Sequence, residues 1–343
     1  MLTYDFEKVD CPLYEYVYKC IKRDILSGKI KPGEKLPSKR AFANNHGIST
    51  ITIQNAYDQL ISEGYVFTIP KKGYYISEIE GMTNLLPITG GVNYDIQIPT
   101  QEKFRIDFSG NGCAQENFPF SVWNRVSRGV MAEKKKELME PSPVCGVREL
   151  REAIAEHLKS FRGMMVDPNQ IIVGAGTEYL YGLLVELLGT NKTYTIENPG
   201  YEKLVHIYRQ RGITCQFASL DEDGVMVSEL KRMKTDVAHI CPNHHFPTGI
   251  TMPASRRYEI LAWANEDANR YIIEDDYDSE FRTEGKPIPT LFSIDACKKV
   301  IYMNTFSKSL SSTIRISYMI LPVSLAKLFY EKLSFYSCTV SNF

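Results

Sequence analysis

The sequence lacks any apolar run long enough to cross a membrane. A spanning helix needs roughly 18 consecutive apolar residues, and none occurs in this chain of 343 residues, which is 43% hydrophobic and 24% charged. The N-terminal residues also lack the basic and then apolar layout of a secretion signal. We therefore expect a cytoplasmic protein without a membrane partner.

Paired cysteines are missing as well. The eight cysteines include no C-x-x-C pair, which argues against a structural zinc site or a disulfide framework and fits a reducing compartment. We interpret the cysteines as small core residues and expect no bound metal. The chain has no internal repeat and no low-complexity stretch, and its length suits two domains.

An excess of one charge is absent from the chain as a whole but present in one segment. The net charge is −1, yet residues 11–77 hold ten Lys and Arg against five Asp and Glu, and the remainder is acidic. A small basic module joined to a larger acidic one suggests a polyanionic partner for the first module only.

The basic segment is predicted to contain three helices. Apolar residues recur at helical spacing over residues 12–27, which begin with a proline and stop before a glycine. Ser38 has the character of an N-cap for a short helix over residues 39–45. Ser49 has the same character for a longer helix that runs to Glu63.

A basic hairpin follows the helices. Val66–Ile69 and Tyr74–Ile76 alternate as strands around the tip Pro70-Lys71-Lys72-Gly73. A helix, a helix-turn-helix and then a β-hairpin make a winged helix-turn-helix. Three motifs of this segment resemble the signature of GntR-type regulators: Leu36-Pro37-Ser38-Lys39-Arg40, Gly47-Ile48-Ser49-Thr50-Ile51-Thr52-Ile53 and Leu60-Ile61-Ser62-Glu63-Gly64-Tyr65.

The resemblance implies double-stranded DNA as a partner, and the residue types fit it. The start of a recognition helix faces base edges, while hydroxyls and cations elsewhere meet phosphates. The candidate DNA-binding residues are Ser38, Arg40, Ser49, Thr50, Thr52, Gln54, Lys71 and Lys72. The alternative is a solvated helical face with a stray basic turn.

Two of these positions depart from the GntR pattern. Similar proteins usually carry arginine where Thr50 and Gln54 stand. The loss of two cations predicts a salt dependence weaker by roughly two phosphate contacts. Because Gln54 can read adenine through a bidentate pair, altered specificity is the other interpretation.

A second domain is predicted after a linker. We assign residues 11–79 to the winged helix-turn-helix, residues 80–103 to the linker and residues 104–343 to an α/β domain with a mainly parallel sheet, whose ligands gather at strand ends. Helices such as Glu178–Leu188 and Ala254–Ala268 lie between its strands. The strand candidates are Gln170–Val173, Thr193–Ile196, Thr214–Phe217, Val237–Ile240, Tyr271–Ile273, Val300–Met303 and Ser317–Leu321.

Five segments that follow these strands together resemble fold-type-I pyridoxal-phosphate enzymes, the aminotransferase superfamily. The first, Gly174-Ala175-Gly176-Thr177-Glu178, opens a helix and has the small residues that let backbone N–H groups approach an anion. The resemblance implies that Ala175, Gly176 and Thr177 hold the cofactor phosphate. The second segment ends in Tyr201, whose ring would stack on the pyridine; the alternative is an ordinary buried tyrosine.

Two further segments bear on the cofactor ring. In Glu274-Asp275-Asp276-Tyr277, Asp275 would keep the pyridine nitrogen protonated and Tyr277 would bond the phenolic oxygen; the alternative is an exposed acidic loop. In Cys241-Pro242-Asn243-His244-His245-Phe246-Pro247-Thr248-Gly249, Phe246 stands where aminotransferases carry an asparagine that contacts the same oxygen. Either Asn243 or a neighbouring histidine would then contact the phenolic oxygen, and the sequence does not choose between them.

The last segment carries the candidate catalytic residue. Lys308 lies in Thr305-Phe306-Ser307-Lys308-Ser309-Leu310, and its amine would bind pyridoxal 5'-phosphate as a Schiff base. Thr305, Ser307 and Arg315 would clamp the phosphate, with the arginine bidentate.

The order of the two halves resembles the MocR/GabR subfamily of transcription regulators, of which Glu274 to Phe281 is characteristic. The resemblance implies a homodimer on paired DNA sites that senses a small amino compound. Fold-type-I chains continue into a small C-terminal domain carrying an arginine for the substrate carboxylate, and we expect that domain to be missing here. Aminotransferase turnover is thereby left doubtful, and an aminotransferase with a fused DNA-binding module and a non-functional remnant are the alternatives.

Overall fold

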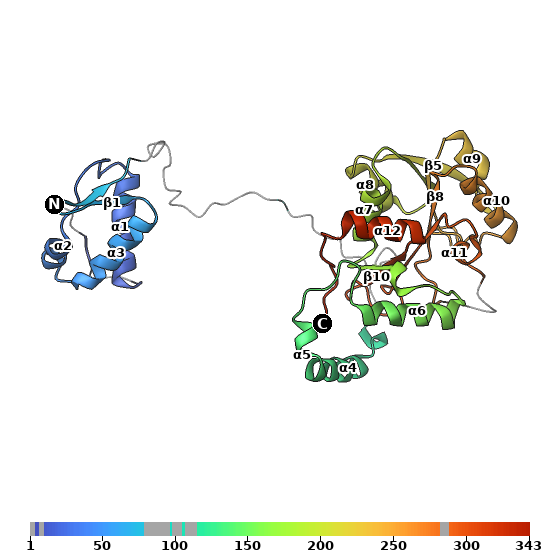
Figure 1. Cartoon of the computed structure of the whole chain (residues 1–343), viewed down its shortest axis with the longest axis horizontal. Helices are drawn as coiled ribbons and strands as arrows, with labels where there is room; N and C mark the ends of the chain where they lie inside the picture. The colour runs from blue at the N-terminus through green and yellow to red at the C-terminus, as the bar shows by residue number, and fades with distance from the viewer. Residues whose placement is uncertain (1–3, 7–9, 79–96, 98–104, 107–114, 282–287) are drawn as a thin grey trace. The chain divides into compact units, whose positions relative to one another are not determined.

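Two units make up the chain. The computed structural model describes residues 4–6, 10–78, 97, 105–106, 115–281 and 288–343. Residue contacts divide the chain into unit 1, residues 1–103, and unit 2, residues 104–343 (Figure 1). The predicted linker, residues 80–103, lies outside the described residues except for residue 97.

Unit 1 has three helices and a two-stranded sheet. Its elements are α1 (Leu13–Leu26), α2 (Lys39–His46), α3 (Thr50–Ser62), β1 (Val66–Ile69) and β2 (Gly73–Ile76), with β1 and β2 antiparallel. Both predicted N-caps are confirmed, because the Ser38 hydroxyl accepts a hydrogen bond from the Ala41 N–H and the Ser49 hydroxyl from the Ile51 N–H, each at 3.2 Å.

The core of unit 1 forms because each helix has one apolar face. α1 and α3 pack together, and α2 and the hairpin close the core around them. The side chains buried there include Val17, Ile21, Phe42, Ile53, Tyr57, Leu60, Val66 and Ile76. This arrangement leaves the start of α3 and the hairpin tip outside the core.

Unit 2 is built on an eight-stranded sheet. The strand order is β3-β10-β9-β8-β7-β4-β5-β6. The five strands from β9 to β5 are parallel, β10 is antiparallel to both of its neighbours and β6 is antiparallel to β5. The strands are β3 (Ile171–Gly174), β4 (Thr193–Asn198), β5 (Thr214–Asp221), β6 (Gly224–Val225), β7 (Val237–Ile240), β8 (Tyr271–Asp275), β9 (Val300–Thr305) and β10 (Ser317–Ile320). The predicted α/β fold with a mainly parallel sheet is confirmed.

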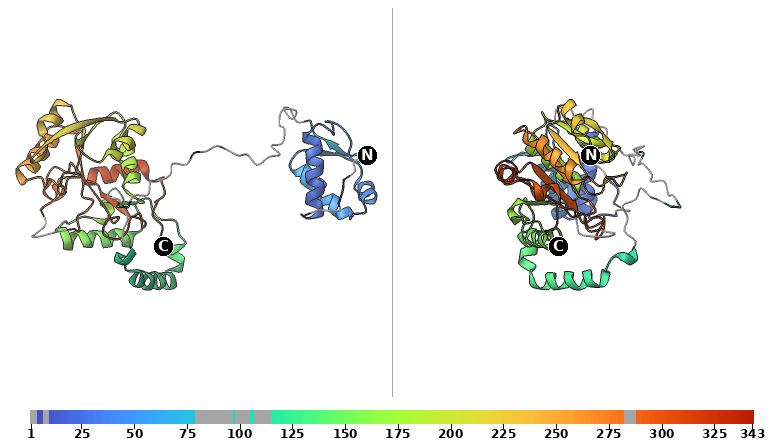
Figure 2. Two further views of the ribbon diagram at one scale, coloured as in Figure 1. Left: turned by 180° about the vertical axis from the view of Figure 1, so that it is seen from behind. Right: turned by 90° about the vertical axis from the view of Figure 1, so that its right-hand side faces the viewer.

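Helices cover both faces of this sheet. One face packs on α7, α8 and α12, and the opposite face packs on α6, α9, α10 and α11 (Figure 1). α4 lies apart from the sheet in every view (Figure 2). The helices are α4 (Phe120–Glu133), α5 (Lys135–Leu138), α6 (Arg148–Arg162), α7 (Thr177–Leu188), α8 (Glu202–Gln210), α9 (Val227–Arg232), α10 (Ala254–Asn265), α11 (Leu291–Ile294) and α12 (Val323–Leu333).

Some predicted bounds were wrong. The predicted strand Thr214–Phe217 continues to Asp221, because β6 folds back and pairs with its end. The predicted helix Ala254–Ala268 ends at Asn265. Within the described ranges, no helix combines the length and the apolar character that a bilayer span requires.

Candidate functional site

The start of α7 and the loop after β9 meet at Gly176. Gly176 is the N-cap of α7 and has a φ of 93°. A Cβ at this position would lie 2.7 Å from Cζ of Arg315, so the guanidinium packs directly against the glycine backbone. Arg315 itself adopts a left-handed φ of 59°, a strained conformation that is frequent at functional sites. A guanidinium beside the positive end of a helix makes a suitable cradle for an anion.

The neighbouring residues of this turn are also accessible. Ala175 and Thr177 are half-buried, and Thr177 is the first residue of α7. The Ala175 N–H donates to Oγ1 of Thr339 at 2.8 Å. Thr339 was not predicted to take part, because nothing in its local sequence relates it to a turn 164 positions away.

A short hydroxyl cluster braces the loop that carries Lys308. Oγ1 of Thr305 lies 2.8 Å from the hydroxyls of both Ser307 and Ser317 and accepts from the Ser307 N–H at 3.2 Å. Thr305 is buried, whereas Lys308 is exposed. The buried threonine is therefore best suited to fixing the loop that carries this exposed lysine.

The three consecutive carboxylates Glu274, Asp275 and Asp276 at the end of β8 point to different sides of the sheet, because side chains alternate along a strand. Oδ2 of Asp275 accepts from the Tyr181 hydroxyl of α7 at 2.9 Å. Oδ1 of Asp275 is buried and has no hydrogen-bond partner among the described residues. Such an orphaned oxygen is rare in folded proteins and suits a donor from a ligand, for example a protonated ring nitrogen.

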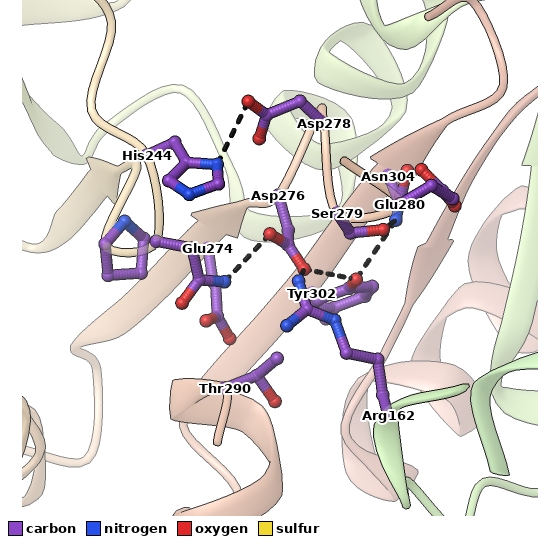
Figure 3. Close-up of polar contacts among 12 residues, drawn as sticks. Arg162, His244, Glu274, Asp276, Asp278, Ser279, Glu280, Thr290, Tyr302 and Asn304 are labelled. Atoms are coloured by element: carbon purple, nitrogen blue, oxygen red, sulfur yellow. Dashed lines mark hydrogen bonds and ion pairs between the residues drawn. The ribbon is translucent and has the colours of Figure 1, made fainter. Parts of the chain in front are cut away.

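Asp276 belongs to a buried network on the other side (Figure 3). It forms an ion pair with Arg162 and accepts from the Tyr302 hydroxyl at 2.7 Å and from Nδ2 of Asn243 at 2.8 Å. Burial raises the pKa of the neighbouring Glu274 to about 7, although its carboxylate accepts two backbone hydrogen bonds. Since Glu274 and Asp276 are fully buried, the interpretation of this segment as an exposed acidic loop is wrong.

The network engages Asn243, one of the substitutes for the asparagine that Phe246 replaces. The Asn243 amide donates to Asp276 and accepts from Nη2 of Arg257 at 2.9 Å. Asn243 and a neighbouring histidine both stay predictions for the contact with the phenolic oxygen. Nδ1 of His245 lies 2.7 Å from the Thr248 hydroxyl, and burial lowers the pKa of His245 below its usual value.

Two tyrosines were predicted to contact the ring. Tyr201 lies at the start of α8 and is 41% exposed, so it is not an ordinary buried tyrosine. Tyr277 is half-buried, and burial together with the charge of Asp278 raises its pKa. The Tyr277 hydroxyl therefore stays protonated and keeps its donor.

The predicted DNA-binding residues lie on the surface of unit 1. Thr52 is half-buried, and the other seven are exposed: Ser38, Arg40, Ser49, Thr50, Gln54, Lys71 and Lys72. The Lys72 N–H donates to the Ile69 carbonyl at 3.0 Å across the hairpin tip, where Lys71 has a φ of 63°. Ile51 is 70% exposed in the first turn of α3 and was not predicted.

Comparisons with known proteins agree with this architecture. Residues 13–76 match the family described as bacterial regulatory proteins, gntR family, and residues 106–337 match aminotransferase class I and II. The chain is 37% identical to the uncharacterized HTH-type transcriptional regulator YdeL of Bacillus subtilis over 97% of the chain and 72% of the relative. It is 29% identical to the probable rhizopine catabolism regulatory protein MocR of Rhizobium meliloti, over 95% of the chain and 68% of that protein.

Solved structures match unit 2. The crystal structure of an archaeal alanine:glyoxylate aminotransferase is 26% identical, with a TM-score of 0.60, over 68% of this chain and 60% of that enzyme. The chain thus spans less than two thirds of the length of that aminotransferase.

Fold and matches together define a transcription regulator that joins a helix-turn-helix domain to an aminotransferase-like domain. The chain belongs to the MocR-type family of such regulators, as its sequence motifs predicted. A gntR-type domain binds double-stranded DNA, and an aminotransferase class I and II domain implies pyridoxal phosphate as the cofactor.

Proposed function

We propose that this regulator binds pyridoxal phosphate through Lys308 and senses a small amino compound there. The single observation that carries the proposal is the pairing of an anion cradle with an orphaned carboxylate oxygen. The guanidinium of Arg315 packs on Gly176 at the start of α7, and Oδ1 of Asp275 is left without a partner at the end of β8. A ligand with a phosphate and a protonated ring nitrogen satisfies both groups.

Each predicted residue has a role in this proposal. Ala175, Gly176, Thr177, Ser307 and Arg315 hold the phosphate, and Thr305 fixes the loop that carries Ser307 and Lys308. Tyr201 covers the ring, Tyr277 donates to its phenolic oxygen and Asp275 accepts from its nitrogen. When bound, the cofactor supplies an aldehyde for an amine and a ring that withdraws electrons; Lys308, an exposed residue, holds it in place.

The Lys308→Ala variant tests the cofactor assignment. We expect it to lose the visible absorption band of lysine-bound cofactor while binding DNA as the unchanged protein does. Lys327→Ala is the matched control, since Lys327 is an exposed lysine on α12; it should keep the band. A band that persists in Lys308→Ala contradicts the assignment.

The sensing role is separated from enzyme turnover by counting product. For a sensor, an amino compound changes the absorption spectrum and the DNA affinity, and at most one equivalent of keto product forms per chain. The likeness of unit 2 to aminotransferases favours the alternative of a fused enzyme. Sustained formation of keto product over many equivalents would support that alternative.

We also infer that the protein is a homodimer. α4 has no buried residue and exposes a set of large apolar side chains, an unusual surface for a monomer: Phe120, Val122, Trp123, Val126, Val130 and Met131. Light scattering should give a dimer for the unchanged protein and a monomer for Val126→Asp. Val323→Asp, at an exposed apolar position of α12, should remain dimeric. A monomeric unchanged protein contradicts the inference.

The eight surface residues of unit 1 form the DNA contact in this proposal. Because the target is chromosomal DNA, we propose that the protein works in the cytoplasm. Its operator can be selected from random duplexes, and an Arg40→Ala protein that binds the selected duplex with unchanged affinity and salt dependence would contradict the assigned surface.

A further inference from the structure

We propose that His239 of β7 is a positioning residue that holds the Asp275 carboxylate toward the cofactor ring nitrogen. This inference rests on the proposed function, because it requires pyridoxal phosphate beside Asp275. The sequence analysis did not single out His239, which lies inside a short apolar strand with no motif around it.

The sheet register brings the two side chains together. β7 and β8 are parallel neighbours in which His239 is paired with Ile273. Ile273 and Asp275 lie on the same face of β8 because side chains alternate, so the imidazole sits diagonally across from the carboxylate. Nε2 of His239 lies 3.5 Å from Oδ2 of Asp275, and His239 is 3% exposed.

The groups beside the two ring nitrogens of His239 determine which nitrogen carries the proton. The Tyr208 hydroxyl lies 2.7 Å from Nδ1 of His239. Burial raises the pKa of Tyr208 well above its usual value, so this hydroxyl keeps its proton and can either donate to Nδ1 or accept from it. The Asp275 carboxylate only accepts, so its place beside Nε2 favours the tautomer with the proton on Nε2, for which the Tyr208 hydroxyl donates to Nδ1.

This Nε2–H group has no hydrogen-bond partner among the described residues. The distance of 3.5 Å to Asp275 is longer than an ordinary N–H···O bond, as is frequent before a ligand is bound. Among the described residues, the imidazole of His239 faces Asp275 from β7. Together with the Tyr181 hydroxyl at 2.9 Å, it directs two donors at Oδ2 and leaves Oδ1 for the ring nitrogen.

The other charged groups around Asp275 do not replace this histidine. Burial, with a smaller contribution from the charge of Asp275, raises the pKa of Glu197 of β4 to about 8, so Glu197 is neutral at neutral pH. Tyr181 and Tyr208, from α7 and α8, are neutral hydroxyls whose pKa values burial raises. These three groups supply no positive charge to the Asp275 carboxylate.

The alternative is a histidine that only fills an aromatic cluster, since its ring also packs edge-on against Tyr181. The affinities for two cofactors, one with and one without a ring nitrogen, distinguish the two roles. The full-length protein and its His239→Leu and His239→Gln variants are titrated with pyridoxal phosphate and with an analogue in which CH replaces the ring nitrogen. Dissociation constants come from protein fluorescence, and the visible band of the lysine-bound cofactor is recorded in parallel.

A positioning role predicts a loss confined to the natural cofactor. His239→Leu should bind pyridoxal phosphate about tenfold more weakly, while His239→Gln, which keeps a donor, should stay within about threefold. Both variants should bind the CH analogue as the unchanged protein does. Tyr208→Phe, which removes the hydroxyl but keeps the imidazole, should show a smaller loss that is again absent for the analogue.

Two outcomes overturn the inference. Equal losses for both cofactors assign His239 a packing role, and no loss for pyridoxal phosphate in any variant removes its role altogether. If His239→Leu does not fold, the same comparison is made between His239→Gln and Tyr208→Phe. Failure of the proposed function would look different, because the unchanged protein itself would then show no lysine-dependent band.

Discussion

The candidate DNA-binding side chains of unit 1 and two carboxylates next to Asp275 in unit 2 lie in opposite environments. In unit 1, Arg40, Gln54, Lys71 and Lys72 are exposed, so water solvates them before any ligand arrives. In unit 2, the carboxylates of Glu274 and Asp276 are fully buried and held by hydrogen bonds or an arginine. A DNA surface can therefore be altered at little cost in folding stability, whereas the carboxylates beside the cofactor site are also part of the fold.

The strongest test of this contrast removes the arginine of the buried Arg162–Asp276 ion pair and leaves the carboxylate in place. Arg162→Met leaves the Asp276 carboxylate buried without its cation, and should lower the unfolding free energy of unit 2 by about 3–5 kcal/mol. Chemical denaturation followed by circular dichroism measures the change. The exposed pair of Lys203 and Glu178 is the matched control, and Lys203→Met should cost under about 1 kcal/mol. Equal effects of the two substitutions would remove the contrast.

The second prediction concerns pH. Burial raises the pKa of Glu197 from an ordinary 4.5 to about 8, so the folded protein holds a proton that the unfolded chain releases. Stability from this group is complete below pH 4.5 and is lost as pH rises through 8. Between about pH 7 and pH 9 the unfolding free energy should fall by about 1.4 kcal/mol on this account.

Glu197→Gln provides the comparison for the pH effect. A glutamine does not titrate, so most of the fall between pH 7 and pH 9 should disappear, leaving a smaller contribution from Glu274, whose pKa is raised to about 7. Denaturation curves at both pH values for both proteins measure the difference. A variant with the same pH dependence as the unchanged protein would show that Glu197 is ionised in the fold.

The features that could be predicted from the sequence are those with local signals. A serine before an apolar helical pattern identified both N-caps, and a proline with two lysines between alternating strands identified the hairpin tip. The position of Asp275 followed from the end of a hydrophobic strand. In each case residues close in the sequence determine the local structure, so the pattern predicts it without knowledge of the fold.

The contacts that could not be predicted join distant segments. Arg162 and Asp276 are 114 positions apart, and His239 approaches Asp275 only because β7 and β8 pair in one particular register. The sequence shows that strands exist but not how they align. The hydrogen bonds of Asn243 to Asp276 and Arg257, which are 33 and 14 positions away, could not be predicted for the same reason.

The third prediction restores a cation to the recognition helix. Thr50 is exposed at the first position of α3, where the resemblance to GntR-type regulators predicts an arginine. Thr50→Arg should steepen the dependence of log affinity on log salt by about 0.9, the contribution of one added phosphate contact. Binding to the selected duplex is measured by fluorescence anisotropy at several salt concentrations. An unchanged slope would mean that position 50 does not reach the DNA backbone.

The smallest effect expected separates charge from backbone strain at the hairpin tip. Lys71 and Lys72 are both exposed, but Lys71 alone has a left-handed φ, of 63°. Lys71→Gly and Lys72→Gly should each reduce the slope of log affinity against log salt by about 0.9 if both lysines meet phosphates.

The two substitutions should change the free energy of unfolding in opposite directions. Lys71→Gly relieves backbone strain and should raise it by under about 1 kcal/mol, while Lys72→Gly only adds freedom to the unfolded chain and should lower it by a similar amount. Thermal unfolding of residues 11–78 within the whole chain reports these changes. Two destabilised variants would show that Lys71 is held without strain, and two unchanged salt slopes would show that the wing does not contact DNA.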